Sequence, residues 1–143
     1  MNKEKQEKYD KAYLRIALEW SKLSHCKRKK VGAIIVKNDM IISDGYNGTP
    51  TGFDNCCEDK NGETLWYVLH AEANAILKTA KSTHNCDGAT LYLTMSPCKE
   101  CSKLAYQAGI KRVVYIKKYK DHSGIKFLAE AGIEIVEIKH SLL

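Results

Sequence analysis

The chain of 143 residues is long enough to bury a hydrophobic core in one domain, and its 44% apolar and 28% charged residues are usual for a globular protein. The formal net charge of +6 favours anionic ligands but does not by itself indicate nucleic-acid binding, so we expect no nucleic-acid partner. Residues 1–11 are polar and lack the apolar core of a signal peptide, and the longest apolar run, 31–36, is too short to cross a bilayer. These features predict a single domain over residues 1–143 that works in the cytoplasm and has no membrane partner.

The first part of the chain predicts a helix, a hairpin and a long loop. Apolar residues recur at a spacing near 3.6 within residues 9–24, which is typical of an amphipathic helix. Two largely apolar runs, 31–36 and 40–46, flank a short polar break and predict a β-hairpin. Residues 47–62 begin with a dense group of turn-forming residues and predict a loop, and a loop of this length is usually functional or disordered.

Helices and strands alternate through the rest of the chain. Pro97 suits the first turn of a helix, and Gly109 and Gly132 suit positions just after helix ends. The alternation predicts βαβ crossovers, and therefore an α/β fold with three α/β/α layers around a five-stranded mixed sheet. In chain order, the predicted elements are a helix over 70–81, a strand over 89–94, a helix over 97–107, a strand over 112–116, a helix over 123–131 and a strand over 133–138.

Six cysteines are many for a chain of this size. In a reducing compartment they indicate metal ligation or catalysis, whereas a secreted disulfide scaffold would need a secretion signal that we do not find. Two of them, Cys98 and Cys101, follow Pro97 at the start of a predicted helix, so both sulfurs project to one side and the helix dipole favours their thiolates. With His70 they supply three zinc ligands and leave a fourth position for water, as in catalytic zinc sites.

Glu72 lies two residues after His70 and can reach a zinc-bound water without being a ligand. Zinc lowers the pKa of that water toward 7, and a carboxylate beside it can move protons to a ring nitrogen and to leaving ammonia. Taken singly, each motif is compatible with a plainer role: a lone histidine is usually a surface or core residue, and Cys-x-x-Cys can be a redox pair. The two motifs together, each opening a helix, match the known signature of zinc deaminases, His-x-Glu followed by Pro-Cys-x-x-Cys.

On these motifs the chain resembles the cytidine/deoxycytidylate deaminase superfamily over roughly residues 9–138, and within it most resembles the deoxycytidylate (dCMP) deaminases. The resemblance implies a cytidine deaminase-like fold, His70, Cys98 and Cys101 as Zn²⁺ ligands, and Glu72 as the catalytic proton shuttle. The segments that carry it are Val31-Gly-Ala-Ile-Ile-Val, Gly45-Tyr-Asn-Gly-Thr-Pro, His70-Ala-Glu-Ala-Asn-Ala-Ile, Ser96-Pro-Cys-Lys-Glu-Cys and Gln107-Ala-Gly-Ile-Lys-Arg-Val-Val-Tyr.

The same resemblance implies three substrate-binding residues. Asn47 matches an asparagine that hydrogen-bonds the sugar, and Tyr119 matches a tyrosine that lines the nucleotide pocket. Arg28 matches a position that meets the 5′-phosphate, which suits its fork-shaped guanidinium. A solvated base in a basic run and an exposed loop tyrosine remain the alternatives for Arg28 and Tyr119.

The function implied is hydrolysis of dCMP to dUMP and ammonia by attack at C4 of cytosine, which supplies dUMP for thymidylate synthesis. The family is often homo-oligomeric, with hexamers among its members, and is controlled by dCTP and dTTP; we would look for the effector in residues 45–55. A second, structural zinc could use Cys26, Cys56 or Cys57 with a nearby histidine, and buried free thiols are the alternative. Other functions left open are deamination of tRNA adenosine, cytidine, guanine or a riboflavin precursor, a non-catalytic zinc-binding module, and a redox protein.

Overall fold

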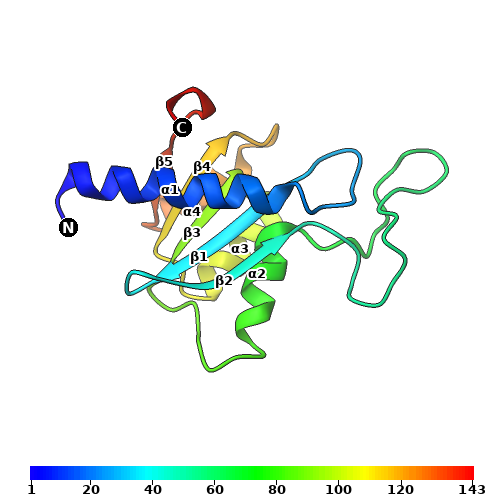
Figure 1. The fold of residues 1–143 in the computed structure, drawn as a ribbon, viewed down its shortest axis with the longest axis horizontal. Coiled ribbons are helices and arrows are strands. Elements are labelled where there is room, and N and C mark those ends of the chain that lie inside the picture. Colours follow the sequence, from blue (N-terminus) through cyan, green and yellow to red (C-terminus); the bar gives the residue numbers. More distant parts are fainter.

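In the computed structural model, which describes residues 1–143, a five-stranded sheet with strand order β2-β1-β3-β4-β5 is covered by helices on both faces (Figure 1). β1 pairs antiparallel with β2 and β3, while β3–β4 and β4–β5 are parallel, so the predicted mixed sheet is confirmed. No helix is both long and apolar enough to cross a membrane. The elements are α1 (Lys3–Ser21), β1 (Gly32–Lys37), β2 (Met40–Tyr46), α2 (Ala71–Thr79), β3 (Thr90–Met95), α3 (Lys99–Gln107), β4 (Arg112–Lys117), α4 (Ser123–Glu130), β5 (Glu134–Glu137) and a final 3₁₀ turn (His140–Leu142).

The sheet divides the hydrophobic core into two layers, because successive side chains of a strand point to opposite faces. On β1, Ala33 and Ile35 pack in the layer that holds α2, α3 and α4, whereas Ile34 and Val36 pack in the layer that holds α1. β3 and β4 divide their buried residues between the same two layers. This explains why the central strands read as continuous apolar runs, which strands buried on both faces require.

α1 is longer at its N-terminus than the apolar spacing predicts, since it begins at Lys3 rather than near residue 9. The Asn2 side chain caps it by accepting a hydrogen bond from the Lys5 amide at 2.8 Å. The first turns therefore form without a continuous apolar stripe. Farther along, α1 approaches β1 at Gly32, where an added Cβ would lie 1.9 Å from the Ala17 carbonyl oxygen.

A buried ionic cluster ties α1 to the sheet. Asp10 is 2% exposed, and its carboxylate accepts two hydrogen bonds from the Arg112 guanidinium, at 2.7 and 2.6 Å, and one from the Tyr92 hydroxyl at 2.6 Å. Burial acts to raise the pKa of Asp10, but the hydrogen bonds from Arg112 and Tyr92 outweigh it, so the pKa lies below its ordinary value. Glu134 on β5 accepts a further bond from Arg112 at 2.8 Å.

The segment between β2 and α2, residues 47–70, contains no regular helix or strand and extends away from the sheet (Figure 1). Two isolated bridges shape it, one between Gly48 and Leu69 and one between Glu58 and Thr64. A disulfide between Cys26 and Cys57 ties it to the segment that follows α1. We expected these cysteines to be thiols or metal ligands; for this pair that expectation is wrong, because the two loops bring their Cα atoms to a separation of 5.1 Å.

Candidate active site

Two helix N-termini meet at the carboxyl end of β3 and supply the zinc-ligand candidates. His70 is the residue before α2, and Cys98 holds the same position before α3. The backbone amide of Cys101 donates to the Cys98 sulfur at 3.4 Å, so this sulfur caps α3. α3 is in turn held by α4, which approaches so closely at Gly124 that an added Cβ would lie 2.4 Å from the Pro97 carbonyl oxygen.

The three predicted ligands point at one another. Nδ1 of His70 lies 3.6 Å from Sγ of Cys98 and 3.3 Å from Sγ of Cys101, and the three ligand atoms all lie within 4.8 Å of one another. A tetrahedral zinc with Zn–S near 2.3 Å and Zn–N near 2.05 Å places such atoms about 3.6 Å apart. The side chains therefore fit Zn²⁺ without rearrangement, and a set of two thiolates and one imidazole leaves one position for water.

The electrostatics suit a thiolate site. The hydrogen bond with Cys101, followed by that with His70, lowers the pKa of Cys98 to about 4 although burial opposes it. The same contact with Cys98 raises the pKa of Cys101, since one proton is shared between two close sulfurs. The hydrogen bond with Cys98 raises the pKa of His70. A metal ion in this position would replace the protons that these groups compete for.

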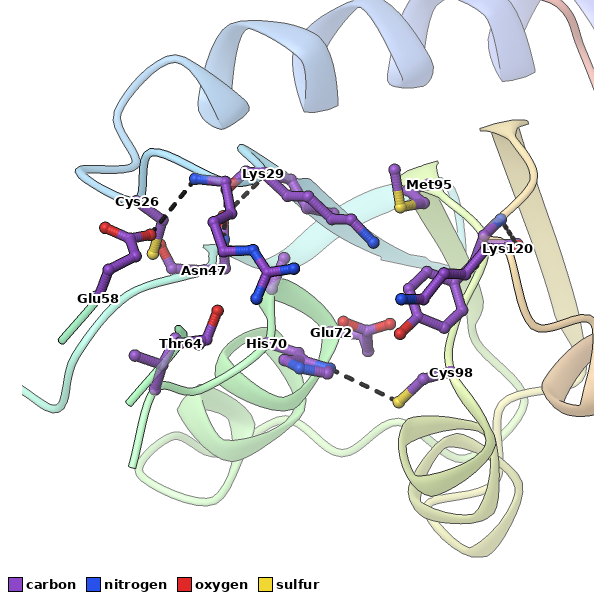
Figure 2. A pocket seen from close by; sticks show the side chains of 16 residues that line it. Cys26, Lys29, Asn47, Glu58, Thr64, His70, Glu72, Met95, Cys98 and Lys120 are labelled. Carbon is purple, nitrogen blue, oxygen red and sulfur yellow. Dashed lines mark hydrogen bonds between the residues drawn. The ribbon is translucent and has the colours of Figure 1, made fainter. Parts of the chain in front are cut away.

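Glu72 lies in the first turn of α2 and is 4% exposed. Burial raises the pKa of its carboxyl to about 7, with His70 and a hydrogen bond from Cys101 acting in the opposite direction. Figure 2 shows the carboxyl group beside His70 and Cys98. A buried carboxyl group beside three metal ligands is placed to exchange protons with whatever the metal binds.

One cavity of about 290 Å³ brings the predicted site together. It is lined by 16 residues, among which are all of the predicted residues except the buried Cys101. The volume is of the order of a small-molecule site. The predicted residues that line the cavity are Arg28, Asn47, His70, Glu72, Cys98 and Tyr119.

Asn47 is buried and holds the wall of the cavity in place. Its side-chain oxygen accepts from the Val31 amide and its side-chain nitrogen donates to the Lys29 carbonyl, both at 2.8 Å. An amide has one further donor and one further lone pair, so a contact with a ligand remains available. Arg28 is half-exposed at the mouth, where its guanidinium pairs with Glu63 at 3.2 Å.

Tyr119 reaches the cavity from the loop after β4, and its backbone amide donates to the Ser96 hydroxyl at 2.7 Å. The sequence patterns did not single out Lys29 and Lys120, which line the same cavity. The Lys29 ammonium lies 4.2 Å from the centre of the Tyr119 ring, a cation–π contact. Lys29 belongs to the basic run 27–30 that the sequence displays, but no sequence pattern places it opposite Lys120.

The second metal site left open by the sequence was to use Cys26, Cys56 or Cys57 with a histidine, whereas the structure gathers Cys26, Cys57 and Glu58. In the structure the two sulfurs are bonded to each other, and Cys56 is exposed and free. The Glu58 carboxylate accepts from the Lys27 and Arg28 amides at 3.0 and 3.3 Å. A disulfide lacks the thiolates that zinc binds, so this cluster joins two loops instead.

Comparison with known proteins places the site in a recognised family. A family model described as the cytidine and deoxycytidylate deaminase zinc-binding region matches residues 7–117. The deoxycytidylate deaminase of Enterobacteria phage T4 is 35% identical over 168 aligned positions, which cover 87% of each chain.

Among solved structures, the dCMP deaminase of cyanophage S-TIM5 in complex with dCMP and dUMP superposes with a TM-score of 0.89, at 47% identity over 96% of this chain and 99% of that one. A diaminohydroxyphosphoribosylaminopyrimidine deaminase/reductase of Thermotoga maritima is more distant. It is 26% identical with a TM-score of 0.71, and the match covers 90% of this chain and 36% of that chain.

Proposed function

Because this chain belongs to the cytidine and deoxycytidylate deaminase family, we propose that it is a zinc-dependent hydrolase that converts dCMP and water to dUMP and ammonia. The observation that carries the proposal is the joint geometry of His70, Cys98 and Cys101 around one point, with Glu72 buried beside them. The cyanophage relative described in complex with dCMP and dUMP supports the choice of substrate.

The chemistry requires a nucleophile at C4 of cytosine and several proton transfers. Zinc held by the three ligands would supply a water whose pKa is lowered toward 7. Glu72 takes one proton from the water as its oxygen bonds to C4 and delivers it to N3. It then takes the remaining proton from the new C4 hydroxyl and delivers it to the amino group as the C4–N bond breaks and ammonia leaves. Burial raises the pKa of the Glu72 carboxyl above its ordinary value, which favours a group that both accepts and donates protons during the reaction.

Three residues of the cavity wall are proposed to hold the nucleotide. Asn47 hydrogen-bonds the sugar through the side-chain N–H and lone pair that its two hydrogen bonds to the backbone leave free. Tyr119 lies against the base, and Arg28 contributes to binding of the 5′-phosphate at the mouth. Replacing Arg28 by Ala should raise KM for dCMP more than KM for deoxycytidine, and equal increases would remove Arg28 from phosphate binding.

We also propose that the enzyme is a homo-oligomer, with a hexamer as one form that the family resemblance allows, and that dCTP activates it while dTTP inhibits it. Support for assembly comes from Phe53 and Trp66 in the segment between β2 and α2, which are 58% and 90% exposed. The effector site is proposed at residues 45–55, and the cellular site of action is proposed to be the cytoplasm, where dUMP would feed thymidylate synthesis. Sedimentation in the presence and absence of dCTP tests both assembly and effector binding.

The role of Glu72 has a direct test. Glu72→Ala should retain zinc, measured by metal analysis of the purified protein, and should lose turnover by at least about 100-fold, because general acid–base catalysis contributes that much or more. Glu100→Ala is a matched control, since this carboxylate is exposed on α3 and pairs only with Lys103. An active Glu72→Ala protein would remove this residue from the mechanism.

A further inference from the structure

The cavity holds two positive charges that no acidic side chain pairs with. Arg28 pairs with Glu63, but Lys29 and Lys120 form no ion pair within 4.0 Å. Both lysines line the cavity that contains Glu72. A surface lysine without a partner is ordinary, whereas two that converge on one small cavity repel each other unless an anion lies between them.

Their side chains come from different loops and meet over the active site. Figure 2 shows Lys29, from the segment before β1, and Lys120, from the loop after β4, both extending toward the space above Glu72. Tyr119 positions the first of them, because the Lys29 ammonium lies over its ring at 4.2 Å. Burial and the charges of Lys120, Arg28 and Lys117 lower the pKa of Lys29, which is consistent with crowding of positive charge.

We propose that Lys29 and Lys120 form the clamp for the 5′-phosphate and that they, more than Arg28, set the preference for a nucleotide over a nucleoside. The inference rests on the proposed function for its substrate, and it adds the residues that determine specificity. A phosphomonoester carries close to two negative charges at neutral pH and matches two free ammonium groups. Arg28 would have to leave Glu63 to contribute equally.

Tyr119 also links the two lysines to the loop that carries the proposed zinc ligand Cys98. Because its ring holds Lys29 and its amide is held by Ser96, the tyrosine connects the phosphate clamp to the segment that carries Cys98. A phosphate bound by Lys29 and Lys120 therefore contacts the same loop that borders the base. A nucleoside lacking the phosphate would leave Lys29 and Lys120 uncompensated and would bind less tightly.

The experiment measures binding of dUMP and of deoxyuridine to the zinc-loaded protein by calorimetry, since these ligands differ only in the phosphate. We expect Lys29→Gln and Lys120→Gln each to weaken dUMP binding about tenfold, in line with loss of one charge-assisted hydrogen bond. In both lysine variants, the affinity for deoxyuridine should change less than about twofold. Arg28→Gln should weaken dUMP binding less than either lysine substitution does. Lys118→Gln is the control, because Lys118 neighbours Tyr119 but lies outside the cavity.

Thermal melting of each variant serves to check that it is folded. Lys120→Arg should keep most of the wild-type affinity for dUMP because it retains the positive charge. Equal losses for dUMP and deoxyuridine, or no loss in the Lys29/Lys120 double variant, would overturn the clamp. The binding measurement does not depend on turnover. If the protein failed to deaminate dCMP, the proposed function would be refuted, but dUMP and deoxyuridine binding would still decide whether the two lysines bind the phosphate.

Discussion

Replacing Gly124 by Ala tests whether α4 holds in place the loop between β3 and α3, which carries Pro97 and the proposed zinc ligand Cys98. An added Cβ would lie 2.4 Å from the Pro97 carbonyl oxygen, 2.4 Å from the Ser102 hydroxyl and 2.8 Å from the Cys98 carbonyl oxygen. Ordinary contact begins at 3.4 Å, so α4 and the loop must separate by about 1 Å. Two of the three contacts are with backbone atoms, which cannot rotate away.

Two effects of the Gly124→Ala substitution oppose each other. Ala is a better helix former than Gly by about 1 kcal/mol, whereas overpacking of this kind costs about 1–3 kcal/mol. Backbone atoms cannot move aside easily, so the upper end of the overpacking cost applies. We therefore expect the free energy of unfolding to fall by about 2 kcal/mol and the melting temperature to fall by about 4–8 °C. Because the shift moves Cys98, kcat/KM should fall by about 100-fold, the usual cost of a 1 Å misplacement.

Differential scanning calorimetry, steady-state kinetics and zinc competition against a chromogenic chelator measure these effects. Lys126→Ala is the matched control, because this residue lies two positions along α4, is exposed, and should change stability by less than about 0.5 kcal/mol. A Gly124→Ala protein with wild-type stability and kcat/KM would refute the reasoning, since it would mean that the loop does not depend on α4.

Further predictions concern stability and the metal. Asp10→Asn removes the buried carboxylate from Arg112 and leaves only the exposed Glu134 as its ionic partner, so it should cost about 3 kcal/mol, or roughly 10 °C in melting temperature. Glu134→Gln, on the exposed side of Arg112, should cost less than about 1 kcal/mol. Because the pKa of Asp10 is lowered in the folded state, the stabilisation by this carboxylate is complete above about pH 4 and is lost as the pH falls through the lowered pKa. The difference in melting temperature between wild type and Asp10→Asn should therefore shrink below about pH 4, and a difference that grows there would contradict this prediction. Reduction of the Cys26–Cys57 disulfide, whose cysteines are 31 positions apart, should lower the free energy of unfolding by about 3–4 kcal/mol, and reoxidation should reverse the loss. An unchanged melting temperature after reduction would show that the bond does not constrain the unfolded chain. A chelator should abolish activity and lower the melting temperature, and Zn²⁺ but not Mg²⁺ should restore both, since thiolates select zinc; full activity after verified metal removal would contradict the site.

Much of the fold follows from local pattern. The alternation of apolar runs with helix signals predicted the mixed sheet, because strands buried on both faces and joined by helices leave few other arrangements. Element ends were less predictable: α1 starts at Lys3, where a cap from Asn2 rather than an apolar stripe decides the boundary. The pairing of Asp10 with Arg112, 102 positions apart, has no sequence signal at all.

The candidate site divides in the same way. His70 and Cys98 could be placed together because the sequence carries both parts of the zinc-deaminase signature, His-x-Glu and Pro-Cys-x-x-Cys, and each part opens a helix. The loops that carry Lys29, Lys120 and Cys57 have no periodicity, so their mutual positions depend on tertiary contacts. The Cys26–Cys57 bond and the pair of unpartnered lysines therefore emerged only from the structure.

The measurement that tests the central claim most directly is ammonia release by the zinc-loaded protein from dCMP, CMP, deoxycytidine and a tRNA substrate, each with and without dCTP. We predict stoichiometric conversion of dCMP to dUMP and ammonia, much weaker turnover of deoxycytidine, and none of tRNA adenosine. Failure to act on dCMP by a protein with zinc bound, together with turnover of another of these substrates, would contradict the assignment.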